Sequence, residues 1–170
     1  MKNKTRVDKY ALKQLIKVVN KKQKFIFGII GIIFIIWGLL LVPINDIYYS
    51  VVLLGALFFI FFVFIFEVVV IHQQKNTKVF KAVTYFMFDF DDFNFVVNTI
   101  CNGELYSYAK HEYLEIHKII ENKNYMFIFI SKTDAYILSK HTLKYKEFEA
   151  IKNRLRLFVK KYKEIWKKAV

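Results

Sequence analysis

Two long apolar runs constrain this chain more than any other feature. Residues 25–42 are 18 consecutive residues without a charge, and residues 51–71 are 21 residues whose one charge is Glu67. As helices they would be about 27 and 31 Å long, close to the roughly 30 Å hydrocarbon core of a bilayer. A short turn with one proline joins them. Because 170 residues leave too little chain to bury two such helices in a soluble core, the runs predict a transmembrane helical hairpin over 25–71.

The distribution of lysine and arginine predicts the orientation of this hairpin. Nine of these residues lie in residues 1–24, none lies in the turn, and three lysines follow the second run. The positive-inside bias therefore predicts a multi-pass protein of the cell membrane with both termini in the cytoplasm. The domain organisation that follows is a basic segment over 1–24, the hairpin, and a cytoplasmic domain over 72–170.

The cytoplasmic part changes from continuous to alternating hydrophobicity, which predicts strands. Six strands at hairpin spacing are expected between residues 85 and 139, and Asn102-Gly103 is a strong signal for a type I′ turn because both central positions need positive φ. An amphipathic helix should follow, because apolar residues recur at spacings of three and four. Its stripe consists of Phe148, Ile151, Leu155, Phe158, Tyr162 and Ile165. The predicted fold class of this part is α+β, an antiparallel β-meander closed by a C-terminal helix.

Parts of this region resemble the C-terminal domain of the YcxB-like family of bacterial membrane proteins. The resemblance rests on residues 113–121, 124–129 and 135–140, although the proline usual before the last lysine is Ser139 here. It implies a basic N-terminal segment, a transmembrane pair and a cytoplasmic domain similar to a pleckstrin-homology (PH) barrel, in the bacterial plasma membrane. It implies no catalytic residues. A barrel of this type has seven strands, so with six strands predicted either one is missed or the sheet is open.

The positive charge is concentrated in two segments. Residues 1–24 carry a net charge of +8 and residues 143–170 carry +7, whereas residues 72–142 are neutral. Residues 5–24 also read as a basic amphipathic helix, which suits the headgroup plane of an anionic leaflet. The alternative to a lipid contact is an ordinary topology signal for the N-terminal segment and a solvated helix face for the C-terminal helix. The candidate residues for contact with lipid or a partner are Lys9, Lys13, Lys17, Lys21, Lys22, Lys24, Arg154, Arg156, Lys160, Lys161, Lys163, Lys167 and Lys168.

The hairpin itself offers a packing seam and one unusual charge. Gly28, Gly31 and Gly38 fall in one sector of the first helix, and small residues let helices approach closely. Glu67 is an intramembrane carboxylate in this reading, and such groups are functional hypotheses by default. Near the end of its run it is expected instead to snorkel or to pair with Lys24.

No residue pattern predicts a metal, cofactor or catalytic site. The spacing of His111 and His117 is too long for a zinc-protease helix, and on a strand it separates the side chains by about 20 Å. Asp89, Asp91 and Asp92 lack the glycine and glutamate of a calcium loop and read as a polar turn. Without a phosphate loop or a nucleophile elbow, an enzyme is not expected.

The function predicted from the sequence is a membrane-anchored, non-enzymatic PH-like module for binding or regulation. Its expected contacts are anionic lipid headgroups or a membrane protein partner. Nucleic acid is disfavoured, because anchoring would bring the same charges closer to lipid. Two alternatives stay open: an accessory subunit of a transporter or membrane enzyme, and a small pore-forming or immunity-type membrane protein.

Overall fold

The computed structural model describes residues 1–40, 48–65, 68–69, 84–132 and 134–165. The chain divides into two compact units. One combines Met1–Leu15 with Thr77–Val170, and the other consists of Ile16–Asn76. The first unit therefore joins segments from both ends of the sequence, and the helices of the second unit lie between them in the chain.

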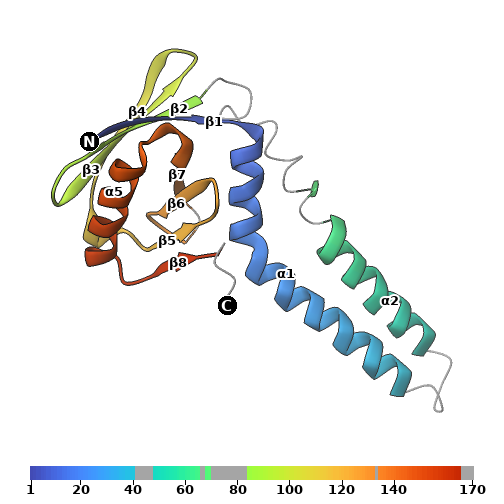
Figure 1. The fold of residues 1–170 in the computed structure, drawn as a ribbon. Helices are drawn as coiled ribbons and strands as arrows, with labels where there is room; N and C mark the ends of the chain where they lie inside the picture. The colour runs from blue at the N-terminus through green and yellow to red at the C-terminus, as the bar shows by residue number, and fades with distance from the viewer. Residues whose placement is uncertain (41–47, 66–67, 70–83, 133, 166–170) are drawn as a thin grey trace. The chain divides into compact units, whose positions relative to one another are not determined.

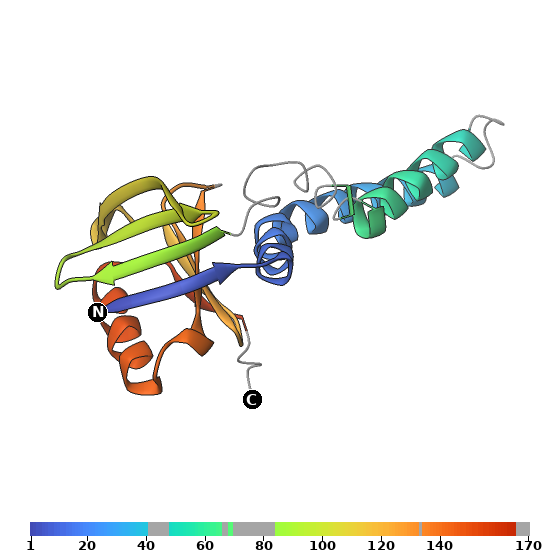
Figure 2. The ribbon, with the colours of Figure 1, turned by 90° about the horizontal axis from the view of Figure 1, so that it is seen from above.

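Sheet A of the first unit has four antiparallel strands in the order β1-β2-β3-β4. The strands are β1 (Lys2–Val7), β2 (Thr84–Phe90), β3 (Asn94–Cys101) and β4 (Glu104–Glu112). Figure 2 shows β1 beside β2, and the two pair from Lys2↔Asp89 to Val7↔Thr84. The β3–β4 turn is as predicted, since Asn102 and Gly103 have φ of 52° and 90°.

Sheet B has four strands in the order β7-β6-β5-β8, and β8 runs parallel to β5. These strands are β5 (Lys118–Glu121), β6 (Tyr125–Phe129), β7 (Ala135–Ser139) and β8 (Tyr162–Glu164). A short 3₁₀ helix over Tyr113–Glu115 follows β4, and another over Lys140–Thr142 follows β7. The helix α5 (Tyr145–Phe158) lies against the strands in Figure 1.

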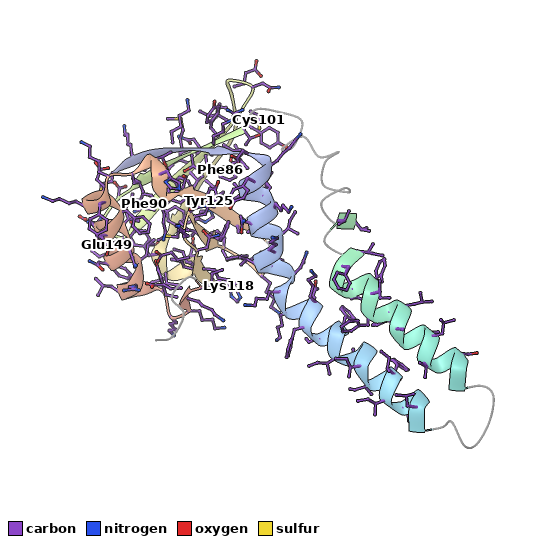
Figure 3. All side chains as sticks on the ribbon, turned by 45° about the vertical axis from the view of Figure 1, so that its right-hand side comes forward. Phe86, Phe90, Cys101, Lys118, Tyr125 and Glu149 are labelled. Carbon is purple, nitrogen blue, oxygen red and sulfur yellow. The ribbon has the colours of Figure 1, made fainter. Side chains whose placement is uncertain are left out.

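Apolar side chains from both sheets and α5 form one core. Phe90, labelled in Figure 3 with its neighbour Phe86, is 2% exposed and stacks on Phe88. Ile151 and Leu155 of α5 pack into the same cluster, which the three- and four-residue spacing predicted. The alternation of β2 and β3 thus places one face of sheet A in the core and leaves the other face outside.

The first unit has the predicted α+β content, but three details of the prediction are wrong. The sheets are two open four-stranded sheets rather than a closed PH-like barrel or one meander. The N-terminal segment begins as strand β1 instead of a helix from residue 5. The C-terminal helix ends at Phe158, so Tyr162 belongs to β8, where its backbone pairs with Ile119.

The second unit contains most of α1 (Lys9–Leu40), followed by α2 (Tyr48–Ile60) and a π-helical segment (Phe61–Ile65). Of the three glycines predicted to form a packing seam, Gly31 lies at a close approach of the helices, and Gly55 of α2 lies at another. A Cβ added at Gly31 would lie 2.9 Å from the Cβ of Phe59, and one at Gly55 would lie 2.9 Å from that of Phe34. The helices approach closely because these positions carry no side chain.

The prediction of two membrane spans is contradicted. Within the described ranges, no helix is both long and apolar enough to cross a membrane. The charge-free part of α1 covers residues 25–40, which is about 24 Å, and α2 has 13 residues, about 20 Å, before the backbone becomes π-helical. Both lengths fall short of the roughly 30 Å of a bilayer core. This finding also contradicts two predictions that depend on the spans. One is the multi-pass topology with both termini in the cytoplasm, and the other is the localisation in the bacterial plasma membrane.

Candidate functional site

The outer face of sheet A combines positive charge with apolar surface. On β1 the inward residues Asn3, Thr5 and Val7 are buried, so the outward Lys2, Lys4 and Arg6 form one exposed row. This row arises from the two-residue period of a strand. We call the outer face the basic face and define it by Lys2, Lys4, Arg6, Tyr85, Met87, Asp89, Val96, Asn98, Ile100, Leu105, Tyr108 and Lys110.

Hydrogen bonds on the inner side of β1 position this row. The Asn3 Nδ2 donates to the carbonyl oxygen of Thr142 at 3.1 Å and to its Oγ1 at 2.9 Å. The backbone N–H of Ser139 donates to Thr5 Oγ1 at 3.0 Å, and that hydroxyl donates to Asn3 Oδ1 at 2.9 Å. Because Thr5 is fully buried, these contacts tie β1 to the end of β7 and keep the cations on the outside.

The strand register gives the basic face three cross-strand rows. The central row runs Lys4–Met87–Asn98–Tyr108 across all four strands. The two neighbouring rows run Lys2–Asp89–Val96–Lys110 and Arg6–Tyr85–Ile100–Leu105. These three rows carry four cations and one carboxylate, a net charge of +3. The two-strand pair Asn94–Glu112 lies next to them on the same face and adds an exposed carboxylate at its margin.

A groove of about 440 Å³ lies along the central row, and its lining includes Lys2, Lys4, Asp89, Asn98 and Tyr108. Lys4 Nζ lies 4.4 Å from the centre of the Tyr85 ring, a cation–π contact that leaves its ammonium at the surface.

In and beyond the groove, β4 exposes large side chains. Leu105 is 65%, Tyr106 62% and Tyr108 63% exposed. The region thus brings together lysine, arginine, tyrosine and aliphatic surface.

The cations of β1 are not among the residues predicted from the sequence, in which residues 1–24 read as one basic segment that is helical from residue 5. The signal was present: charged and uncharged residues alternate over residues 2–7. The selected Lys9, Lys13, Lys17, Lys21 and Lys22 are exposed on α1, and Lys24 is half-buried there. Glu67, Lys167 and Lys168 lie outside the described residues.

The selected arginines at the C-terminal end have intramolecular partners. Arg154 donates to the carbonyl oxygen of Asp91 at 2.7 Å and pairs with Asp92 at 3.1 Å. Arg156 pairs with Glu164 and lies over the Tyr162 ring. Lys160, Lys161 and Lys163 are exposed beyond the end of α5. The structure therefore does not gather the described C-terminal cations on one helix face, since they are divided between α5, the segment after it and β8.

A buried ionic cluster lies away from the basic face, between β5, β8 and α5. Glu121 is fully buried and pairs with Lys140 and, at 3.3 Å, with Lys152, while the Tyr162 hydroxyl donates to it at 2.7 Å. Lys152 also lies 3.0 Å from Glu164 of β8. Burial by itself would raise the pKa of Glu121, but hydrogen bonds from Lys140 and Tyr162 and the charges of Lys140 and Lys152 outweigh burial and lower its pKa. This cluster attaches β8 to the rest of the unit.

Comparison with known proteins supports the resemblance seen in the sequence. A family model described as YcxB-like protein matches residues 102–153, from the β3–β4 turn into α5. No curated protein and no solved structure shows a significant match. The match covers β4 of the basic face and the lysines and Glu121 of the buried cluster, but it does not reach β1. Over residues 102–153 the chain is thus similar to the YcxB-like family.

Proposed function

We propose that this protein is a non-enzymatic binding module that contacts anionic lipid headgroups through the basic face. The observation that carries the proposal is the exposed row of Lys2, Lys4 and Arg6 beside the groove on sheet A. The face offers charge and aromatic surface rather than a nucleophile with an adjacent general base, which favours binding over catalysis.

The energetics of such a contact are electrostatic. Each lysine or arginine near an anionic leaflet contributes about 1 kcal/mol, and the attraction falls off within about 8 Å at physiological salt. The three cations of β1 lie on one strand face, so they can approach one surface together. Their combined contribution is about 3 kcal/mol.

The apolar and aromatic residues of the same region favour lipid over another polyanion. Tyrosine, with an apolar ring and a polar hydroxyl, is enriched where membrane meets water. Leu105, Tyr106 and Tyr108 of β4 are more than half exposed, and Tyr108 lines the groove. This contact is made at the headgroup surface and needs no membrane span.

Vesicle binding by the full-length protein tests the proposal. Binding to phosphatidylcholine vesicles is compared with binding to vesicles that also contain phosphatidylglycerol, at low and high salt. Binding to the neutral vesicles measures the charge-independent part, so the difference between the two measures the charge-dependent part.

Matched triple variants locate the contact. Lys2→Gln with Lys4→Gln and Arg6→Gln should weaken the charge-dependent binding by about 100-fold, which is the fold-change for about 3 kcal/mol. Lys160→Gln with Lys161→Gln and Lys163→Gln removes the same charge elsewhere and should have a much smaller effect. Equal effects of the two triples would contradict the role of the basic face. An oligonucleotide that binds as tightly at the same salt would overturn the assignment to lipid.

A further inference from the structure

Among the carboxylates on the outer face of sheet A, Asp89 is the one that lines the groove. Asp89 is the cross-strand partner of Lys2 and lines the groove with Lys2 and Lys4. Its Oδ2 lies 4.0 Å from Lys2 Nζ, and its Oδ1 accepts a hydrogen bond from the N-terminal ammonium of Met1 at 3.3 Å. The Asp89 side chain is 41% exposed, so its charge is accessible from the groove.

This position makes Asp89 a competitor of any anionic ligand. A phosphate in the groove would approach the same ammonium groups that Asp89 already neutralises, and the carboxylate would repel it. Because β2 places residue 89 on the outer face of the sheet, packing of the core does not require a carboxylate here. Its effect on the face is to reduce the positive charge next to Lys2.

We infer that Asp89 sets the density of anionic headgroups above which the basic face binds. This inference rests on the proposed function. On a surface with few anionic lipids, the internal pairs of Asp89 outcompete the few anionic headgroups within reach. On a strongly anionic surface, several anionic headgroups act on Lys2, Lys4 and Arg6 together, and the contact forms despite Asp89. The module would thus distinguish strongly from weakly anionic membranes.

The test is a titration of phosphatidylglycerol in vesicles with full-length Asp89→Asn. This variant keeps the shape of the side chain and removes its charge. At a fixed lipid composition it should bind about fivefold more tightly, the fold-change for one charge near an anionic surface. The fraction of phosphatidylglycerol needed for half-maximal binding should fall accordingly.

Asp92→Asn is the matched control, because it makes the same change in net charge. Asp92 lies in the turn between β2 and β3, pairs with Arg154, and does not line the groove of the basic face. Asp89→Asn that binds no better than Asp92→Asn overturns the inference. Wild-type protein that shows no charge-dependent binding refutes the proposed function instead, so the two failures are distinguishable.

A double-mutant cycle keeps the inference testable if Asp89→Asn loosens the N-terminus. Lys2→Gln should weaken binding by a small factor in the wild-type background, where Asp89 already neutralises part of the Lys2 charge. In the Asp89→Asn background the same substitution should weaken binding several-fold more. Equal factors in both backgrounds would show that the two residues do not interact during binding and would overturn the inference. Thermal denaturation of each variant checks that the fold is retained.

Discussion

Glu121→Gln provides the sharpest test of how the first unit is stabilised. The substitution keeps the size of the side chain and an oxygen that can accept the hydrogen bond from Tyr162, but it removes the charge that faces Lys140 and Lys152. Removal of one member of a buried ion pair typically costs 3–5 kcal/mol, because the opposite charge stays buried. Glu121 is fully buried, and the Lys140 and Lys152 side chains are 15% and 7% exposed.

The magnitude should lie near the lower end of that range. Lys152 keeps Glu164 at 3.0 Å, and Lys140 is exposed enough to recover part of its hydration. We therefore expect a loss of about 3 kcal/mol in the free energy of unfolding. Hydrogen–deuterium exchange of peptides that cover β5 and β6 measures this loss in the unit concerned, separately from the helical hairpin.

The pH dependence gives a second, independent readout. Because the pKa of Glu121 is lowered in the folded state, its stabilising contribution is complete above its unfolded pKa, for which the reference is 4.5, and is lost as the pH falls through the lower folded value. The stability difference between wild type and Glu121→Gln should therefore be constant near neutral pH and should shrink in acid.

Glu104→Gln is the control, because Glu104 is an exposed carboxylate on β4 and its substitution should change stability by less than about 0.5 kcal/mol. A loss below about 1 kcal/mol for Glu121→Gln, or a loss independent of pH, would refute the argument from the buried cluster.

Three further substitutions test other parts of the fold. Thr5→Val should cost about 1–3 kcal/mol in thermal denaturation, because it leaves the buried N–H of Ser139 without its acceptor, and Thr5→Ser should recover most of the loss. Gly103→Val should cost about 1–2 kcal/mol because its φ is 90°, although nothing lies within 4 Å of an added Cβ; a neutral result would contradict the turn geometry. Gly31→Leu should separate α1 from α2, since an added Cβ would already lie 2.9 Å from that of Phe59. If an engineered disulfide between the two helices still forms in this variant, the close approach at Gly31 is contradicted.

Local patterns in the sequence predicted the regular elements of the first unit well. The alternation in β2 and β3, the turn at Asn102-Gly103 and the stripe of α5 as far as Phe158 are all present. Each of these signals depends on neighbours a few residues apart, which is why one sequence is enough to identify it. The resemblance to the YcxB-like family also rested on short local segments, and the family-model match over residues 102–153 confirmed it.

The basic face could not be assembled from the sequence. Lys4 and Tyr108 belong to one cross-strand row, although more than a hundred residues separate them in the chain. In the sequence, residues 2–7 appear as part of a long basic segment, and six residues of alternation are a weak signal next to the helical period that follows. Only the pairing with β2 shows that these residues form a strand.

The apolar runs show the opposite error, in which a strong local signal was extended too far. The apolar runs extend over residues 25–42 and 51–71, and the prediction took each whole run as one membrane-spanning helix. The described helices have different bounds, and none of them has the length and apolarity that a span requires. Similarly, the helical spacing puts Lys152 outside the apolar stripe of α5, whereas its side chain is buried beside Glu121 and Glu164.

The sequence by itself determined which segments of the first unit alternate, where the tight turn lies and which helix face is apolar, because these properties follow from side-chain chemistry at fixed local spacing. The tertiary structure alone decided which strands are neighbours, which charges are buried and which cations share a surface. These properties depend on contacts between distant segments, whose energies are settled only when the core and the two sheets form together.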